Sequence, residues 1–305
     1  GAAPFGHTVE WTLNRYRHFD HEENARWVLT GDSRGYDLEI TQMYYEPNLF
    51  YRKFIRNQEF QKRYQLDPEL ILAYIKGTGK GQIIAGRGMD LDNIDGVYRM
   101  NLYMGIPYEK EVPVRLVQAL CWYQDNLLIP EKDLPLIQDW LDARYRAYDL
   151  FIYDEQYIAF EYMLSKVVET YAQELVLGKK TKIEPSLWVL TDTRFIQSLY
   201  SEESTKQLAK RILLLDFYDV IGIYVSEKLE LPSLLTNATE LEQVESSLKE
   251  YLENHFGGDY ANIHFSVAIH RTTDFRKRFR QISINVKTDS GHISGRTFSA
   301  DKNYV

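Results

Sequence analysis

Cysteine is almost absent from this chain of 305 residues, which contains only Cys121. A single cysteine excludes an internal disulfide framework and a zinc site built from several thiolates. Long apolar runs are also missing: no stretch reaches the ~20 apolar residues that a membrane-spanning helix needs, and no secretory signal pattern is present. We therefore expect a protein of the reducing cytoplasm that does not associate with membranes.

An excess of basic residues is missing as well, because the formal net charge is −8 at pH 7. This balance argues against a surface covered with nucleic-acid-binding groups. Residues 271–280 are a local exception, with five Lys or Arg, one Asp and two Phe. Such a segment is typical of a single-strand nucleic-acid surface or, more often, of a solvated strand edge protected by charge. Nucleic acid therefore stays an open alternative as a partner, and residues 271–280 are the segment that would bind it.

Most of the remaining sequence carries helical patterns. Asp67 and Pro68 open an apolar-periodic run in the manner of a helix start. Residues 77–81 (GTGKG) lack the full phosphate-loop pattern, so we expect a flexible loop there. Helices are expected over residues 4–30, 111–177, 204–217 and 240–254, and alternating strands over residues 263–269 and 281–286. The fold class is therefore mainly α, with a helical domain over residues 1–225 and a small α+β lobe over residues 226–305.

Two histidines near the beginning of the sequence each precede a glutamate. His7 and Glu10 are three positions apart, so on a helix they share one face. A carboxylate in that position can orient the imidazole and fix its tautomer, as general acid–base catalysis requires. His21 follows after a short turn and can face the same cleft. Short His/Glu spacings are common, so the spacing alone more often indicates a solvated helix end with two surface histidines, and both interpretations stay open.

Four segments carry a resemblance to a known family. Residues 4–10 (PFGHTVE) resemble the end of the HD-domain signature H-D-x-G-x-x-P-F-(S/G)-H-x-x-(D/E), and residues 89–99 (MDLDNIDGVYR) resemble D-x-D-(K/R)-x-D-Y-x-x-R. Residues 20–22 resemble the histidine–glutamate pair of the next helix, and residues 143–148 with Glu161 resemble the A-R-Y-x-x-Y helix. In this order they are similar to the deoxynucleoside triphosphate triphosphohydrolases, among them the bacterial dGTPases, over residues 1 to about 224.

The resemblance implies an HD-domain helical fold and a metal-dependent phosphohydrolase that acts on nucleotides. Its reaction would release a nucleoside and triphosphate, with a divalent cation such as Mg, Mn or Fe as cofactor and a homo-oligomer as the assembly. The histidine–aspartate pair that names the family, and one further histidine, would precede Gly1. We expect that these ligands belong to an N-terminal portion missing from this sequence, because the downstream motifs survive.

The resemblance also assigns catalytic and metal-binding roles. His7, supported by Glu10, would activate the attacking water, and His21 would donate or shuttle a proton. Asp92 matches the family's last metal-ligating aspartate, and its carboxylate oxygens suit a divalent cation. Without the resemblance, the acidic stretch around Asp92 and Asp95 is better explained as a helix N-terminus that needs no metal.

Arg144, Tyr148 and Asn93 are the substrate-binding residues that the resemblance implies. The guanidinium of Arg144 suits bidentate binding of phosphate oxygens. The alternative for Arg144 is a surface ion pair with a neighbour such as Asp142, and the sequence does not decide between the two.

Several departures from the family pattern concern the sugar pocket. Asn93 stands where relatives have lysine or arginine, Gly96 and Met100 stand where they have tyrosine and aspartate, and residues 152–154 (IYD) replace Y-x-H. The catalytic residues are thus retained while the deoxyribose contacts are not. Two alternatives therefore stay open beside the nucleotide phosphohydrolase: an HD nuclease or phosphodiesterase acting on nucleic acid, and a non-catalytic nucleotide-sensing subunit.

Overall fold

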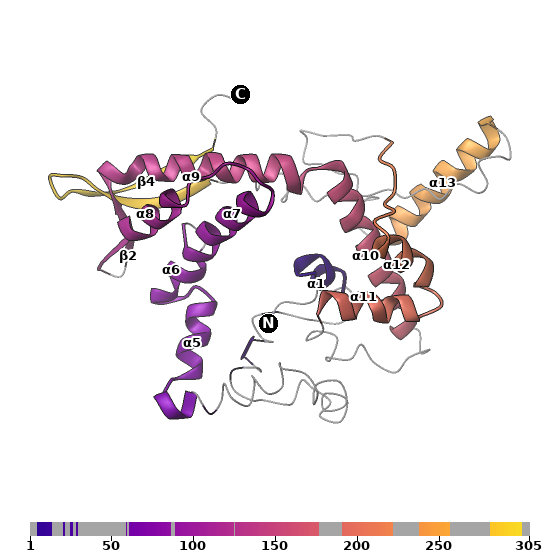
Figure 1. Ribbon diagram of the computed structural model, residues 1–305, viewed down its shortest axis with the longest axis horizontal. Helices are drawn as coiled ribbons and strands as arrows, with labels where there is room; N and C mark the ends of the chain where they lie inside the picture. The colour runs from indigo at the N-terminus through magenta and orange to yellow at the C-terminus, as the bar shows by residue number, and fades with distance from the viewer. Residues whose placement is uncertain are drawn as a thin grey trace. The chain divides into compact units, whose positions relative to one another are not determined.

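The structure is a computed structural model that describes residues 5–13, 21, 25–26, 29, 59, 61–86, 89–124, 126–176, 191–221, 238–256 and 281–300. The described part is mostly helical and contains one four-stranded sheet (Figure 1). This confirms the mainly α fold expected from the sequence. Among the described helices, none has the length and apolar character needed to cross a membrane.

Contacts divide the chain into two units, residues 1–218 with 279–305, and residues 219–278. The described element of the second unit is α13 (Ala238–Phe256), which confirms the charged helix expected over residues 240–254. The strands β3 (Gln281–Lys287) and β4 (Ile293–Ser299) belong to the first unit. The sequence places them in a C-terminal lobe over residues 226–305, whereas in the structure β3 pairs with a strand from the middle of the chain.

The sheet has the order β1-β2-β3-β4, with β1 (Cys121–Tyr123) and β2 (Asn126–Pro130) joined as an antiparallel pair. Leu128 of β2 lies opposite Asn285 of β3 in a parallel pair, and β4 continues the sheet antiparallel to β3. The expectation of helix throughout residues 111–177 is therefore wrong at these two strands. Periodicity cannot separate a short buried strand from a helix segment, and here the distant partner β3 decides.

One hydrophobic core lies between this sheet and three helices, α7 (Leu91–Tyr103), α8 (Glu111–Ala119) and α9 (Leu134–Ala147). Figure 1 shows α9 running along the sheet, after the short helix η3 (Glu131–Asp133). Alternate residues of β3 are buried in this core, as a half-buried strand requires. They pack with a row of buried side chains from α9. The core residues are Ile282, Ile284, Val286, Ile137, Trp140 and Leu141.

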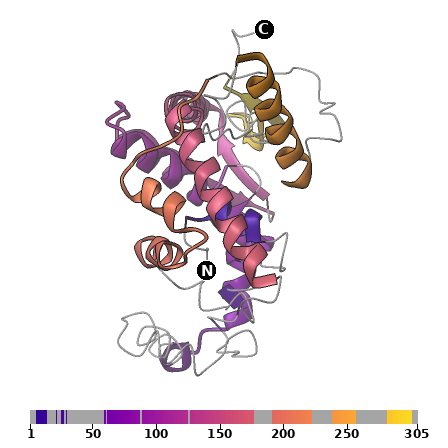
Figure 2. The same ribbon diagram turned by 90° about the vertical axis from the view of Figure 1, so that its right-hand side faces the viewer.

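A second core surrounds α10 (Glu155–Val176), which follows α9 after a π-helical turn, η4 (Tyr148–Ile152). The helices α1 (His7–Leu13), α11 (Asp192–Ser201) and α12 (Lys206–Leu213) pack against it. In both views α1 lies beside α10 (Figures 1 and 2). The helix expected over residues 204–217 is thus confirmed as the shorter α12. The buried residues include Val9, Met163, Leu164, Val168, Phe195 and Leu199.

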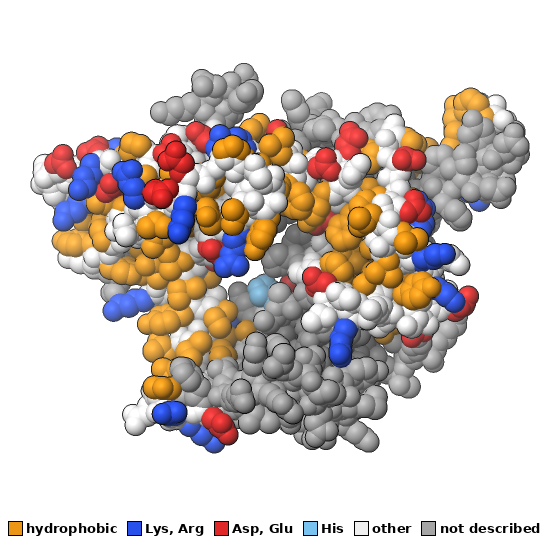
Figure 3. Space-filling view, viewed as in Figure 1, with side chains coloured by type: hydrophobic (Ala, Val, Ile, Leu, Met, Phe, Trp, Pro, Cys, Tyr) orange, Lys and Arg blue, Asp and Glu red, His pale blue; other side chains and the backbone are white. Residues whose placement is uncertain are grey.

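The segment before α7 contains α5 (Pro68–Ile75), η2 (Gly79–Gly81) and α6 (Gln82–Ala85). The Asp67 side chain accepts a hydrogen bond from the Glu69 amide, which confirms the predicted helix start. Gly77 has φ +66°, and a Cβ there would collide with the Ala85 carbonyl oxygen. The glycine-rich turn is therefore closely packed. Hydrophobic side chains, including Leu70 and Ile84, gather on the surface of α5 and α6 (Figure 3).

Candidate functional site

A buried carboxylate holds a half-exposed imidazole at the beginning of the chain. Glu10 of α1 is 6% exposed, and its Oε1 and Oε2 lie 3.0 and 3.2 Å from Nδ1 of His21. The backbone N–H of His21 also donates to Oε1, at 3.3 Å. Because a carboxylate only accepts hydrogen bonds, Nδ1 carries the proton in this contact. The His21 side chain is 39% exposed, so part of it is within reach of solvent or a ligand.

This pairing differs from the prediction made from the sequence, in which Glu10 supports the imidazole of His7. The structure brings Glu10 to His21, 11 positions away. His7 is the first residue of α1, but its side chain lies outside the described part of the structure, so its catalytic role stays a prediction. Spacing rules detect pairs within one helix, whereas the Glu10–His21 pair needs a change of chain direction between its members.

Polar and apolar contacts fix α1 against its neighbours. The Thr8 hydroxyl donates to Oε1 of Glu161 on α10 at 3.1 Å, and the Phe5 amide donates to Asp192 at 2.9 Å. Val9 is fully buried in the second core. Glu10 is therefore presented from a helix that is held on two sides, which limits its freedom to turn away from His21.

The acidic residues of segment 89–99 lie in different environments at the N-terminus of α7. Asp90 is fully buried and accepts from the backbone N–H of Asn93 at 2.8 Å. The Asn93 amide also donates to both oxygens of Asp90, at 2.7 and 2.8 Å. Asp90 thus behaves as the helix-capping residue of the alternative interpretation. Asp92 is exposed in the first turn of α7. The substrate contact expected of Asn93 stays a prediction.

Among the described residues, Asp92 is the one that the sequence predicts as a metal ligand. The exposed carboxylate of Asp92 is an oxygen donor of the kind that hard divalent cations prefer. Within the described ranges, no three His, Cys, Asp or Glu side chains come together in a way that could hold a metal ion. One carboxylate is too few ligands for such a site, so we derive no reaction step through a metal from this geometry.

Arg144 is buried in the last turn of α9, with 3% of its surface exposed. Its guanidinium carbon lies 3.8 Å from the centre of the Tyr148 ring, a cation–π contact. The alternative of a surface ion pair with Asp142 is wrong: Arg144 is not on the surface, and Asp142 accepts from Gln138 at 2.9 Å. Stacking on the ring restricts the plane of the guanidinium, as directional binding of phosphate oxygens requires.

Asn101 links α7 to α9 beside Arg144, a role that sequence reasoning missed. It is fully buried, and its amide donates to the carbonyl oxygens of Val97 at 2.8 Å and Ala143 at 3.2 Å. A buried polar group needs partners, and the two carbonyl oxygens satisfy the amide nitrogen of Asn101. The contact fixes the backbone of the residue next to Arg144.

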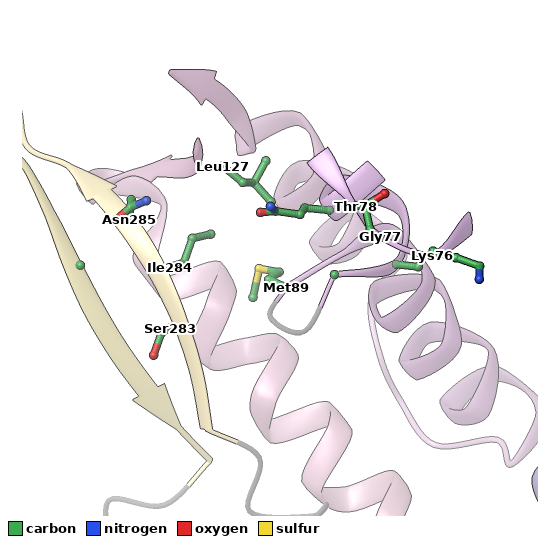
Figure 4. Close-up of a pocket in the computed structure, with 12 residues that line it drawn as sticks. Lys76, Gly77, Thr78, Met89, Leu127, Ser283, Ile284 and Asn285 are labelled. Carbon is green, nitrogen blue, oxygen red and sulfur yellow. The ribbon is translucent and has the colours of Figure 1, made fainter. Parts of the chain in front are cut away.

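A cavity of about 520 Å³ lies apart from the predicted site residues, none of which lines it. In Figure 4 the strand with Ser283, Ile284 and Asn285 borders one side, and the turn with Gly77 and Thr78 borders the other. The cavity is large enough for a small molecule, but its lining has no imidazole or carboxylate. We therefore assign the candidate site from the Glu10–His21 contact.

Comparisons with known proteins give a match of fold. No family model matches the chain, and no curated protein matches it. Among solved structures, the chain is similar to a phosphohydrolase (BT4208) from Bacteroides thetaiotaomicron VPI-5482, with a TM-score of 0.58 and 16% sequence identity. The match covers 97% of this chain and 70% of that chain. The mainly helical fold is therefore shared with a phosphohydrolase.

Proposed function

We propose that this protein is a phosphohydrolase acting on nucleotides, with His21 as its proton-transfer residue. The observation that carries the proposal is the contact between the buried Glu10 carboxylate and Nδ1 of His21, at 3.0 Å. It fixes one tautomer of a ring whose side chain is 39% exposed, and a general acid or base needs both a fixed orientation and access to the reacting groups. The shared fold with a phosphohydrolase and the four resembling segments support the same reaction class.

In the proposed reaction, water adds its oxygen to a phosphorus atom as the bond to the leaving oxygen breaks. His21 exchanges one proton at Nε2, with the attacking water or with the leaving oxygen. Arg144, stacked on Tyr148, neutralises charge on the phosphate oxygens. Asp92 is the predicted metal ligand among the described residues, and a divalent cation at Asp92 stays a prediction of the resemblance. The products would be a nucleoside and triphosphate.

We propose a broader sugar tolerance than that of the family. Gly96 stands on α7 one turn after Asp92, and a Cβ added there meets no atom within 4 Å. The family places a tyrosine side chain at this position to contact deoxyribose, so this chain leaves that space open. We expect the preference for deoxyribonucleotides over ribonucleotides to be about 10- to 200-fold lower than in the family, since one missing contact is worth ~1–3 kcal/mol.

The test is incubation with Mg²⁺ or Mn²⁺ and a panel of nucleoside triphosphates, with the products resolved by chromatography. His21→Ala should lower kcat by about 10²- to 10⁴-fold, the usual contribution of a positioned general acid or base. His292→Ala, in the exposed turn between β3 and β4, is the matched control and should retain wild-type turnover. Equal turnover of wild type and His21→Ala would remove the proposed role.

A nucleic-acid substrate is the second candidate, because the basic segment 271–280 offers phosphate-binding charge and the sugar contacts of the family are lost. That segment lies outside the described residues. This candidate predicts shortened oligonucleotides as products and an affinity that falls steeply with salt concentration. Nucleotide binding without any product would instead favour the sensing subunit.

A further inference from the structure

One carboxylate on α10 joins the two halves of the proposed site. Oε1 of Glu161 accepts a hydrogen bond from the Thr8 hydroxyl at 3.1 Å and another from the Tyr157 hydroxyl at 2.9 Å. Thr8 belongs to α1, two positions before Glu10, and is 153 positions from Glu161. The first bond is therefore a tertiary contact that ties the helix of the Glu10–His21 pair to α10.

The second bond leads toward Arg144. Tyr157 lies at the beginning of α10, and its ring is 4.6 Å from the ring of Phe151 in the π-helical turn. Burial, then the nearby Glu161 carboxylate, and to a smaller extent Tyr148, raise the pKa of the Tyr157 hydroxyl above its usual range. Tyr157 therefore keeps its proton and remains a donor to Glu161. Tyr148 belongs to the same π-helical turn as Phe151 and is the ring on which Arg144 stacks.

We propose that Glu161 is a positioning residue for the hydrolytic reaction. Through Thr8 it sets the place of α1, which carries Glu10, and through Tyr157 it sets the turn whose Tyr148 supports Arg144. The inference rests on the proposed function and assigns Glu161 no contact with the substrate. A single side chain thus relates the proton-transfer pair to the phosphate-binding guanidinium.

The expected effects differ between the two bonds, because they act on different groups. Thr8→Val removes a hydroxyl with little change in shape, and should lower kcat about tenfold with KM nearly unchanged, since small misplacements of catalytic groups are costly. Tyr157→Phe should raise KM about tenfold, because it loosens the support of the phosphate-binding Arg144. Glu161→Gln keeps an acceptor oxygen and should retain most activity, whereas Glu161→Ala should show both defects.

The experiment measures kcat and KM for wild type, Thr8→Val, Tyr157→Phe and the double variant. Thr12→Val is the matched control on α1, because the Thr12 hydroxyl donates to the Thr8 carbonyl oxygen at 2.9 Å and does not bond Glu161. Both bonds share one oxygen. The fold-loss of kcat/KM in the double variant should therefore be smaller than the product of the two single fold-losses, by a factor of at least about three. Multiplicative losses, or a Thr12→Val defect equal to that of Thr8→Val, would overturn the inference.

Thermal unfolding of the same proteins separates this inference from the proposed function. If wild type hydrolyses nothing, the proposed function fails and the positioning role fails with it. The shifts in Tm then still decide whether Glu161 couples the two helical segments: non-additive shifts support the coupling, and additive shifts exclude it. If wild type is active but the losses are multiplicative, only the inference about Glu161 fails.

Discussion

Replacing Glu10 with glutamine tests how much the proposed site depends on a charged partner for His21. The substitution keeps the size of a side chain that is 8% exposed and removes its charge. Hydrogen bonds to a charged group contribute about 1.5–3 kcal/mol and neutral ones about 0.5–1.5 kcal/mol. The difference, about 1–2 kcal/mol, corresponds to about 5- to 30-fold in kcat if it is expressed in the transition state.

The assay compares kcat and the urea midpoint of unfolding for wild type and Glu10→Gln. Glu131→Gln is the matched control, because Glu131 forms an ion pair with Arg296 at 2.7 Å, with both side chains about two-fifths exposed. Such a surface pair contributes about 0–1 kcal/mol, so the control should keep full turnover. If Glu10→Gln changes neither kcat nor the unfolding midpoint beyond the control, the carboxylate does not hold His21 as described.

Three further predictions concern the stability of the fold. Asn101→Leu should lower the free energy of unfolding by about 1–3 kcal/mol in urea denaturation, because it removes the donor to the buried Ala143 carbonyl; an unchanged midpoint would contradict this. Leu215→Gly should raise the free energy of unfolding by about 1 kcal/mol. Leu215 follows the end of α12 with φ 57°, where a side chain is strained, and it is 75% exposed, so little packing is lost. A lower free energy of unfolding in this variant would contradict the strain at Leu215. Burial raises the pKa of Tyr108, whose hydroxyl has no hydrogen-bond partner among the described residues. The folded state therefore favours the protonated form of Tyr108. The resulting contribution to the free energy of unfolding is present below pH ~10, which is the pKa of tyrosine in the unfolded chain, and it is lost as the pH rises above that value. Tyr108→Phe should flatten this loss in melting curves from pH 8 to 11, and parallel wild-type and variant curves would refute it.

Local sequence signals were sufficient for much of the helical fold. Asp67 before Pro68 marks the start of α5, and the charged pattern of α13 appears where the sequence indicates it. These features depend on neighbours within a few positions, so a sequence contains them directly. The strand β2 was not predicted, because only its pairing with β3, more than 150 positions later, distinguishes it from a helix segment.

The candidate site was predictable in its residue types and less so in its partners. Glu10, His21 and Arg144 were identified from motif positions, and two of them, Glu10 and His21, contact each other. The sequence did not indicate that Glu10 would bond His21, nor that Glu161 would bond Thr8, since both contacts depend on how helices pack. Burial was the other missing quantity: it distinguishes the capping Asp90 from the exposed Asp92, which identical side chains cannot do.

Chemical rescue of His21→Ala by added imidazole tests the central claim most directly. The His21 side chain is 39% exposed, so removing it opens a space that a small base can enter from solvent. The account predicts that imidazole restores a measurable, saturable part of the nucleotide hydrolysis lost in His21→Ala while leaving wild-type turnover unchanged. No restoration in a folded variant, or turnover that never fell, would contradict the claim that His21 transfers the proton.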